Sequence, residues 1–263
     1  MVFSLTREKT GRMKKFPSWC PDLNVESTAM ISGAFEQAGK QNNNKRWRPQ
    51  TLSVIPVMAT TQIRALGART DSVARVINLD LLKIFPNFQD LVLNRDIAAA
   101  VLHTLETLSD AAIAMGIEST ALVAKTLFSN QYGHHVPCNV NSLLADYNTF
   151  VSALKQIIHG GGCSNTEFCE SHSSFYRELR VQAPGRVFIT TAGGRIGMAG
   201  NCVQPGDQIC IFFNLHSPFV LRRGNGINEW QFNGAAYIEG LMNGEIFDLR
   251  DFEHEGCDEF LIS

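Results

Sequence analysis

Pro205-Gly206-Asp207-Gln208-Ile209-Cys210-Ile211-Phe212-Phe213 decides the fold of this chain, because a tight turn leads directly into an apolar strand. In such a turn, glycine supplies backbone freedom and the aspartate side chain accepts a backbone N–H. The residues after the turn alternate as expected for a strand with one buried face. The pattern predicts a β core that includes Ile209, Ile211, Phe213, Val220 and Tyr237.

Four further strand-like segments surround this stretch, at residues 186–191, 195–198, 219–223 and 229–239. Glycine-rich turns separate several of them. Short strands separated by turns are typical of a meander or a small barrel. We therefore predict an antiparallel, small-barrel-like β module at residues 179–250.

The residues after this module are strongly acidic. The last 19 residues of the sequence hold seven acidic side chains against the single basic residue Arg250. Such a charge run is typical of a solvated segment. We predict an exposed acidic tail at residues 251–263, with Phe247, Phe252 and Phe260 as anchors.

Upstream, apolar residues recur at the spacing of a helix face in two stretches. Residues 120–128 predict a shorter helix between them. Gly116 and Gly160-Gly161-Gly162 are expected to end the two longer helices, and Asn139 or Asn141 to cap the start of the second. The first face consists of Ile97, Val101, Leu105, Leu108, Ala112 and Met115, and the second of Leu143, Tyr147, Phe150, Leu154 and Ile157.

Residues 51–58 and 62–66 are β-branched and apolar, and they predict a hairpin. Pro56 favours an edge position, since proline donates no hydrogen bond to a neighbouring strand. The fold class is therefore α+β, with a short N-terminal β-hairpin and a helical group before the β module. Residues 51–160 form this first part, after a basic extended arm and polar loop at 1–50 and before a flexible loop at 161–178.

Composition excludes several classes of protein. The chain has 263 residues, of which 44% are hydrophobic, and a net charge of −2, so the total charge does not favour nucleic acid. No apolar run reaches the ~18 residues that a membrane span needs. The seven cysteines are an odd number, and the sequence contains no N-x-S/T site. Both features favour a reducing compartment, and we expect a cytoplasmic protein.

One cluster of soft ligands is a candidate metal site. His159, Cys163, Cys169 and His172 give the spacing H-x3-C-x5-C-x2-H, which could surround zinc tetrahedrally. The spacing differs from the usual zinc motifs, and a glycine-rich stretch interrupts it. We favour a loop that happens to contain these residues, and predict no metal.

No catalytic motif is present, and we predict neither catalytic residues nor a cofactor. Residues 194–200 resemble a phosphate-binding loop, but a strand follows where that motif requires a helix, so a hairpin is favoured. The nucleophile elbow G-x-S-x-G is absent. Asp207 and Glu245 have no identifiable catalytic partner and are interpreted as turn residues. A Cys–His pair that meets only in space stays open, whereas Cys202 and Cys210 are interpreted as core residues.

The β-rich part resembles the C-terminal region of fungal heterokaryon incompatibility (HET-domain) proteins. That region commonly reads as PGD, an apolar strand, P-x-V-L-R and A-Y-V-x-G-x-M-x-G-E. Segments 16–22, 66–76, 124–127 and 185–199 are similar to further family motifs in the same order. The resemblance implies structural roles for Trp19, Gly67, Asp71, Pro205, Gly206, Asp207, Pro218, Leu221, Arg222, Tyr237, Gly240, Met242, Gly244 and Glu245.

The sequence also departs from the family. Glu239 stands where the family often has His, so a ligand role of that His does not carry over. The sequence given contains no segment that resembles the motifs of the HET domain itself. The resemblance implies a role in non-self recognition and programmed cell death when fungal hyphae fuse.

Three hypotheses follow. The first is a non-catalytic accessory region that binds a protein partner, self-associates or restrains a missing effector domain. The second is a small Cys/His-dependent hydrolase or metal-binding enzyme, and the third is a truncated product without independent function. Mapping the start of translation relative to Met1 distinguishes an accessory region behind an upstream HET domain from a stand-alone homologue.

Overall fold

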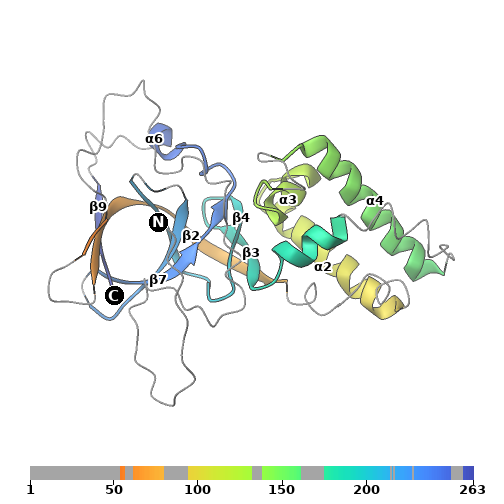
Figure 1. Ribbon diagram of the computed structural model, residues 1–263, viewed down its shortest axis with the longest axis horizontal. Helices are drawn as coiled ribbons and strands as arrows, with labels where there is room; N and C mark the ends of the chain where they lie inside the picture. Colours follow the sequence, from red (N-terminus) through yellow and green to blue (C-terminus); the bar gives the residue numbers. More distant parts are fainter. Residues whose placement is uncertain are drawn as a thin grey trace, which may run out of the picture.

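The computed structural model describes residues 54–56, 62–79, 94–131, 138–160, 175–213, 215, 217–226, 228–249 and 257–263. These residues form three layers: a closed β ring, a small β meander beside it, and a helical layer on the far side of the meander (Figure 1). The fold is α+β with a C-terminal barrel, which confirms the predicted class.

Five strands close the ring in the order β2, β5, β6, β7, β9, and β9 returns to β2. All these neighbours are antiparallel except β7 and β9, which are parallel. A short strand β1 pairs with β2 outside the ring. The bounds are β1 Val54–Pro56, β2 Ile63–Asn78, β5 Gln208–Phe212, β6 Pro218–Arg223, β7 Glu229–Ala235 and β9 Asp258–Ile262.

The long strand β2 belongs to both β layers. Its residues 63–67 pair with β9, residues 67–72 pair with β5, and residues 73–78 pair with β3. The register shifts at Arg69/Asp71 and again at Val73/Arg75, and such bulges bend a strand. Gly67 lies at the crossing point, where a Cβ atom would come 2.2 Å from the carbonyl oxygen of Ile211. Only glycine allows this approach.

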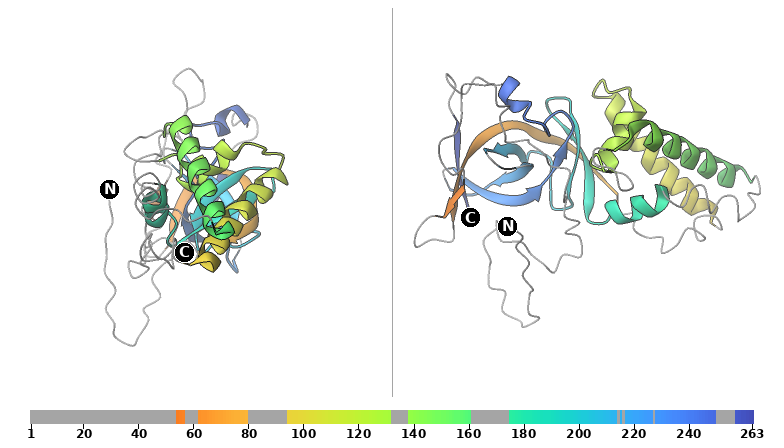
Figure 2. Two further views of the ribbon diagram at one scale, coloured as in Figure 1. Left: turned by 90° about the vertical axis from the view of Figure 1, so that its right-hand side faces the viewer. Right: turned by 45° about the horizontal axis from the view of Figure 1, so that its top comes forward.

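The meander consists of β3 (Arg186–Thr191), β4 (Ile196–Gly200) and the two-residue strand β8 (Tyr237–Ile238). Together with β2 they form the wall between ring and helices (Figure 2). An apolar layer joins this wall to the outer face of the ring. It includes Ala68, Val73, Val187, Ile189, Ala199, Ile209, Ile211, Phe213, Val220 and Ile238.

A separate cluster fills the interior of the ring, and each of the five strands contributes to it. The ring of Phe260 packs edge-on against Phe212 at 5.4 Å and lies 5.7 Å from Trp230, measured between ring centroids. The cluster consists of Ala65, Cys210, Phe212, Leu221, Trp230, Phe260 and Ile262.

The helical layer contains α2 (Arg95–Ile113), α3 (Thr120–Leu127), α4 (Val140–His159) and a helical stretch at 175–182. The side chains of Asn94, Ser119 and Asn139 accept hydrogen bonds from the first free amides of α2, α3 and α4. Gly160 ends α4 in the left-handed conformation, with φ of 78°.

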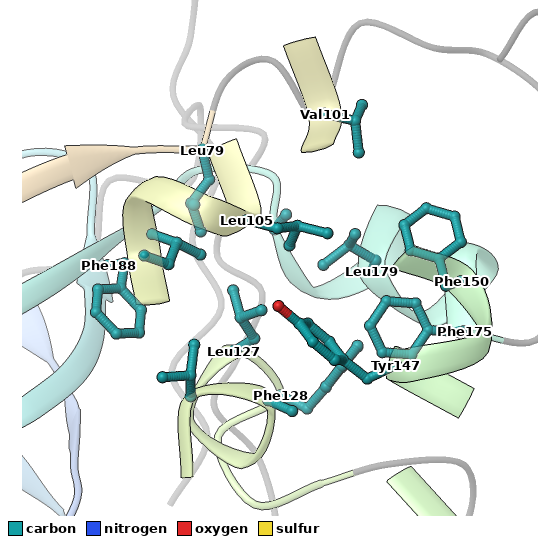
Figure 3. Packing of buried hydrophobic residues seen from close by; sticks show 14 of the residues in the cluster. Leu79, Val101, Leu105, Leu127, Phe128, Tyr147, Phe150, Phe175, Leu179 and Phe188 are labelled. Carbon is teal, nitrogen blue, oxygen red and sulfur yellow. The ribbon is translucent and has the colours of Figure 1, made fainter. Parts of the chain in front are cut away.

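This layer has its own aromatic core, shown in Figure 3. Phe175 lies at the centre, 5.2 Å from Phe128, 5.1 Å from Phe150 and 5.9 Å from Tyr147 between ring centroids. Phe188 of β3 extends the same cluster into the wall. None of the helices in the described part of the chain combines the length and hydropathy that a membrane crossing requires.

Several sequence predictions are confirmed. The faces predicted for α2 and α4 point into the helical core, although Ile97 near the start of α2 and Met115, two residues after its end, are only partly buried. The hairpin of residues 51–58 with 62–66 exists as the β1–β2 pair, with Pro56 on a strand that has β2 as its neighbour. Ile209, Ile211, Phe213, Val220 and Tyr237 are all buried.

Three expectations were wrong. The strand at 208–213 does not have one buried face, because one side faces the ring interior and the other the wall, so Cys210 and Phe212 are buried as well. Residues 229–239 form two strands, β7 and β8, with Ala236 between them. The acidic tail at 251–263 is in part a barrel strand, since β9 is fully paired and Phe260 is 1% exposed. The β module therefore includes β2 and β9, which lie outside 179–250.

Candidate functional site

The motif residues of the sequence gather where the layers join. Pro205, Gly206 and Asp207 form the turn before β5, with φ of 92° at Gly206. The amide of Gly206 donates to the carbonyl of Val73 and the amide of Val73 donates to the carbonyl of Asp207, both at 2.8 Å. The turn therefore continues the pairing of β2 and β5.

The side chain of Asp207 is the centre of a buried polar network and is 4% exposed. Arg222 donates from Nε to Oδ1 and from Nη2 to Oδ2, each at 2.8 Å, which is a bidentate ion pair. The amide of Gln204 and Nδ2 of Asn233 also donate to Oδ2, at 2.9 Å and 3.0 Å. The hydrogen bond to Asp207 raises the pKa of Arg222, so the guanidinium stays charged.

Arg222 and Asp207 come from two separate sequence motifs, and the structure brings them together. Nη2 of Arg222 also donates to the carbonyl of Cys202 at 2.8 Å, which fixes the turn after β4. The network thus connects β5, β6, β7 and the end of β4. Because the carboxylate is saturated by donors, it is a structural group and not an available base.

Asp71 has the same structural role on β2. Its side chain, also 4% exposed, accepts from the amides of Ser72 at 2.8 Å and Gly193 at 2.9 Å, and from Nη1 of Arg195 at 3.1 Å. A Cβ atom on Gly193 would come 2.5 Å from Asp71 Oδ2, so a side chain there would have to displace this carboxylate. Asp71 therefore ties β2 to the β3–β4 hairpin, the structure predicted for residues 194–200.

A third polar group joins the wall to the helices. The hydroxyl of Tyr237 on β8 donates to Oε2 of Glu239, and Nζ of Lys125 on α3 donates to Oε1 of the same carboxylate at 2.8 Å. The side chains of Lys125 and Glu239 are 22% and 23% exposed. Burial raises the pKa of Tyr237 above its ordinary value of 10.0, and the charge of Glu239 raises it further.

Both residues of this ion pair lie in segments that resemble family motifs. Lys125 belongs to the segment similar to R-T-L, and Glu239 to the segment similar to A-Y-V-x-G. The two residues pair across the layers.

Arg186 at the start of β3 is a buried cation that the sequence analysis did not identify. It is 3% exposed, and its Nη1 donates to Oγ of Ser129 at 3.1 Å and to Oε1 of Gln182 at 3.4 Å. Burial lowers its pKa to about 10. Its position between α3, the helix at 175–182 and β3 identifies it as another connection between layers. It lies in segment 185–199, which resembles a family motif, but its partner Ser129 is 57 residues away, so the sequence does not reveal this contact.

The remaining motif residues shape turns and core. Leu221 lies in the ring interior, and the carbonyl of Pro218 accepts from the amide of Ala236 at 2.9 Å. After β8, Gly240 and Gly244 have positive φ, and both Met242 and Glu245 bond to nearby backbone amides. These residues lead the chain into α6 (Ile246–Leu249). Trp19 lies outside the described residues.

Burial determines the state of two of the described cysteines. Cys138 and Cys210 are buried, and burial raises the pKa of both thiols. Cys202 is exposed and not a core residue as expected, because it lies in the turn after β4, where its thiol donates to the carbonyl of Asn233 at 3.1 Å. Thiols with raised pKa values are poor nucleophiles at neutral pH.

The predicted metal candidates fall mostly outside the described residues. Cys163, Cys169 and His172 are among those not described, and so are His134 and His135. His159 is exposed at the end of α4. Among the described residues, no group of three His, Cys, Asp or Glu side chains is arranged to hold a metal ion.

The geometry is therefore that of a barrel whose motif residues hold its layers together. Residues 165–261 match the Het-6 beta-barrel domain family, a range that begins after β2. Heterokaryon incompatibility protein 6, OR allele, of Neurospora crassa is 35% identical over 81 residues. The match covers 30% of this chain and 12% of that protein. No solved structure matches the chain. Over residues 165–261 the chain is therefore similar to the Het-6 β-barrel domain of fungal heterokaryon incompatibility (HET) proteins.

Proposed function

We propose that this chain is a non-catalytic accessory region of a heterokaryon incompatibility protein, acting in the cytoplasm in non-self recognition and programmed cell death. Its role is to bind a protein partner or to restrain an effector domain. One observation carries the proposal: the buried motif carboxylates Asp71 and Asp207 are committed to ion pairs that hold strands together. Asp71 and Asp207, both 4% exposed, accept three and four hydrogen bonds.

The state of the potential acids and nucleophiles supports a non-catalytic role. A general base needs a free lone pair within reach of a substrate proton. The oxygen lone pairs of Asp71 and Asp207 instead accept hydrogen bonds from guanidinium groups, backbone amides and a side-chain amide. Burial also keeps the thiols of Cys138 and Cys210 and the hydroxyl of Tyr237 protonated at neutral pH.

The shape of the molecule favours a role in protein contacts. Figures 1 and 2 show the helical layer at one end of the molecule and the closed ring at the other, with the wall between them. A partner therefore finds two separate surfaces, one helical and one formed by strands. The polar connections at Asp71, Asp207 and Lys125–Glu239 hold these surfaces at fixed positions.

The test is a cell-death assay in fused fungal hyphae. The chain is expressed in one of two strains that differ in incompatibility type, and the fraction of dying fusion cells is counted with a vital dye. We expect the chain to change this fraction, and the barrel-disrupting variant Phe260→Asp to abolish the change. The matched variant Glu259→Gln alters an exposed residue of the same strand and should behave as the parent.

Two outcomes contradict the proposal. The first is equal cell death with the parent chain, with Phe260→Asp and with no chain. The second is a robust hydrolytic or redox activity of the purified chain, measured with ester, phosphate and nicotinamide dinucleotide substrates. An activity of this kind would show that the chain itself is an enzyme.

A further inference from the structure

Among the described residues, β9 pairs with β2 on one edge and with β7 on the other, and it fills the gap between them. This gap is called the acceptor below. Five register pairs join it to β2, from Ile63↔Ile262 to Gly67↔Asp258. On its other edge it runs parallel to β7, where the amide of Leu261 donates to the carbonyl of Asn228 at 3.2 Å. Without β9 the ring is open along this line.

The side chains of β9 match this acceptor in polarity. Phe260 and Ile262 point into the ring interior and are 1% and 0% exposed. The alternate residues carry charge: Glu259 pairs with Nε of Arg64 at 2.8 Å. Asp258 accepts from the amide of Arg69 at 2.9 Å and from its Nη2 at 3.1 Å. The acidic side chains of β9 therefore face basic side chains of β2, and the apolar side chains of β9 face the apolar interior of the ring.

The number of residues between α6 and β9 sets an upper limit on how far the strand can lie from its own ring. Eight residues, 250–257, separate the end of α6 at Leu249 from the start of β9 at Asp258. An extended segment of this length spans roughly 27 Å at about 3.4 Å per residue. In Figure 1, β9 lies on the side of the ring away from the helical layer, so a second molecule can approach it without meeting the helices.

We propose that β9 is an exchangeable closing strand, and that the β9 of one copy closes the ring of a second copy. Each pairing, ion pair and buried side chain of β9 would be reproduced between the copies, because the acceptor is identical. The exchange is reciprocal and gives a two-fold symmetric dimer. This inference rests on the interaction role proposed above and deepens it by naming a second copy of this chain as the partner.

Concentration decides which closure predominates. The strand competes with its own copy at an effective concentration in the mM range, as for other short linkers. A chain at micromolar concentration therefore closes mainly on itself, and the exchanged dimer increases with concentration. High local concentration in a cell would favour the dimer.

The sharpest test reverses the charges of the acceptor and of the strand in separate chains. The acceptor variant is Arg64→Glu/Arg69→Glu, and the strand variant is Asp258→Lys/Glu259→Lys. In each variant alone, the chain's own strand meets an acceptor of like charge. In an equimolar mixture, each acceptor meets a strand of opposite charge on the other chain.

Mass is measured by light scattering after size exclusion, at equal total concentration. We expect the mixture to contain about tenfold more dimer than either variant alone, since several charge pairs change from repulsive to attractive together. The control chain with all four substitutions should close on itself and remain mainly monomeric. A monomeric mixture beside this folded control, or equal dimer in a single variant, would overturn the proposal.

A second measurement serves if the charge-reversed chains fail to fold. Leu66 and Glu259 are register partners in the β2–β9 pair. Leu66→Cys in one chain and Glu259→Cys in an isotope-labelled second chain are mixed at high concentration and oxidised mildly. Mass spectrometry should find the 66–259 disulfide joining a labelled and an unlabelled peptide. Its absence, while one chain with both cysteines forms the bond internally, overturns the exchange.

The two proposals fail separately. If the charge-reversed mixture stays monomeric while Phe260→Asp still abolishes the effect on cell death, the strand exchange is wrong and the accessory role stands. If exchange is found but the chain has no effect in fused hyphae, the accessory role is wrong and the dimer remains a property of the fold.

Discussion

Replacing Phe260 by alanine removes the largest β9 side chain from the centre of the ring. Phe260 is 1% exposed, and it contacts the rings of Phe212 and Trp230 at centroid distances of 5.4 Å and 5.7 Å. The lost burial of a phenyl group and the cavity left behind each contribute. Together they cost about 3–5 kcal/mol of unfolding free energy.

The measurement is urea unfolding followed by tryptophan fluorescence and by circular dichroism. A domain of this size loses ~2–4 °C of melting temperature per kcal/mol, so a decrease on the order of 10 °C is expected as well. The matched control is Glu259→Ala, whose side chain is 55% exposed and whose ion pair with Arg64 is solvated, so a change within ~0.5 kcal/mol is expected.

A loss below ~1 kcal/mol for Phe260→Ala would refute the reasoning. It would mean that the acidic end of the sequence does not close the ring, and that the original expectation of an exposed tail was correct. Equal losses for Phe260→Ala and Glu259→Ala would have the same meaning, because only the first side chain faces the interior.

Three further predictions test the connections between layers. Asp207→Ala leaves a guanidinium and an amide without their acceptor and should cost about 2–4 kcal/mol in urea unfolding; an unchanged midpoint would contradict the network. A double-mutant cycle of Lys125→Met and Glu239→Gln should give a coupling of only ~0.5–1 kcal/mol, because both side chains are about one-quarter exposed; a zero coupling would show that the layers do not depend on this pair. The folded-state pKa of Tyr237 lies above the ordinary value of 10.0, so above pH 10 the unfolded hydroxyl ionises first and stability falls. The decline measured from pH 9 to 11 should be shallower in Tyr237→Phe, and identical slopes would argue against a buried hydroxyl.

Much of the fold could be predicted from local patterns. The apolar spacing of α2 and α4 reports a helix face because side chains three and four residues apart share one side. Asn139 and Gly160 mark the ends of α4 because their chemistry satisfies free backbone groups there. The Pro-Gly-Asp turn likewise locates the start of β5.

The closing strand was missed because its local pattern is ambiguous. Phe260 and Ile262 alternate as in a half-buried strand, but Asp258 and Glu259 beside them made the segment resemble a solvated tail. Its acceptor β2 lies 189 residues away at the Arg69–Asp258 contact, and no local pattern reports such pairing. The burial of Cys210 was missed for a related reason. Both faces of β5 are buried, and this can be predicted only when the layers on both sides of the strand are known.

The candidate site was predictable in its residues and not in its contacts. Asp207 and Arg222 were both identified, but their mutual ion pair was not, and Asp71 was identified without its partner Arg195. The latter two lie 124 residues apart. The order of the motifs indicates which residues have structural roles. Which of these residues form ion pairs with one another depends on how the strands are arranged in space.

The helical layer has a consequence for how this architecture can vary. β2 ends at Asn78 and its neighbour β3 starts at Arg186, with Asn78 paired to Val187. Everything between them, including α2, α3 and α4, is an excursion from one antiparallel step of the sheet. Insertions are tolerated where the ends of the inserted segment lie close together. The excursion can therefore change in length or internal arrangement while every strand of the ring keeps its register, provided that it still covers the apolar wall at Phe188.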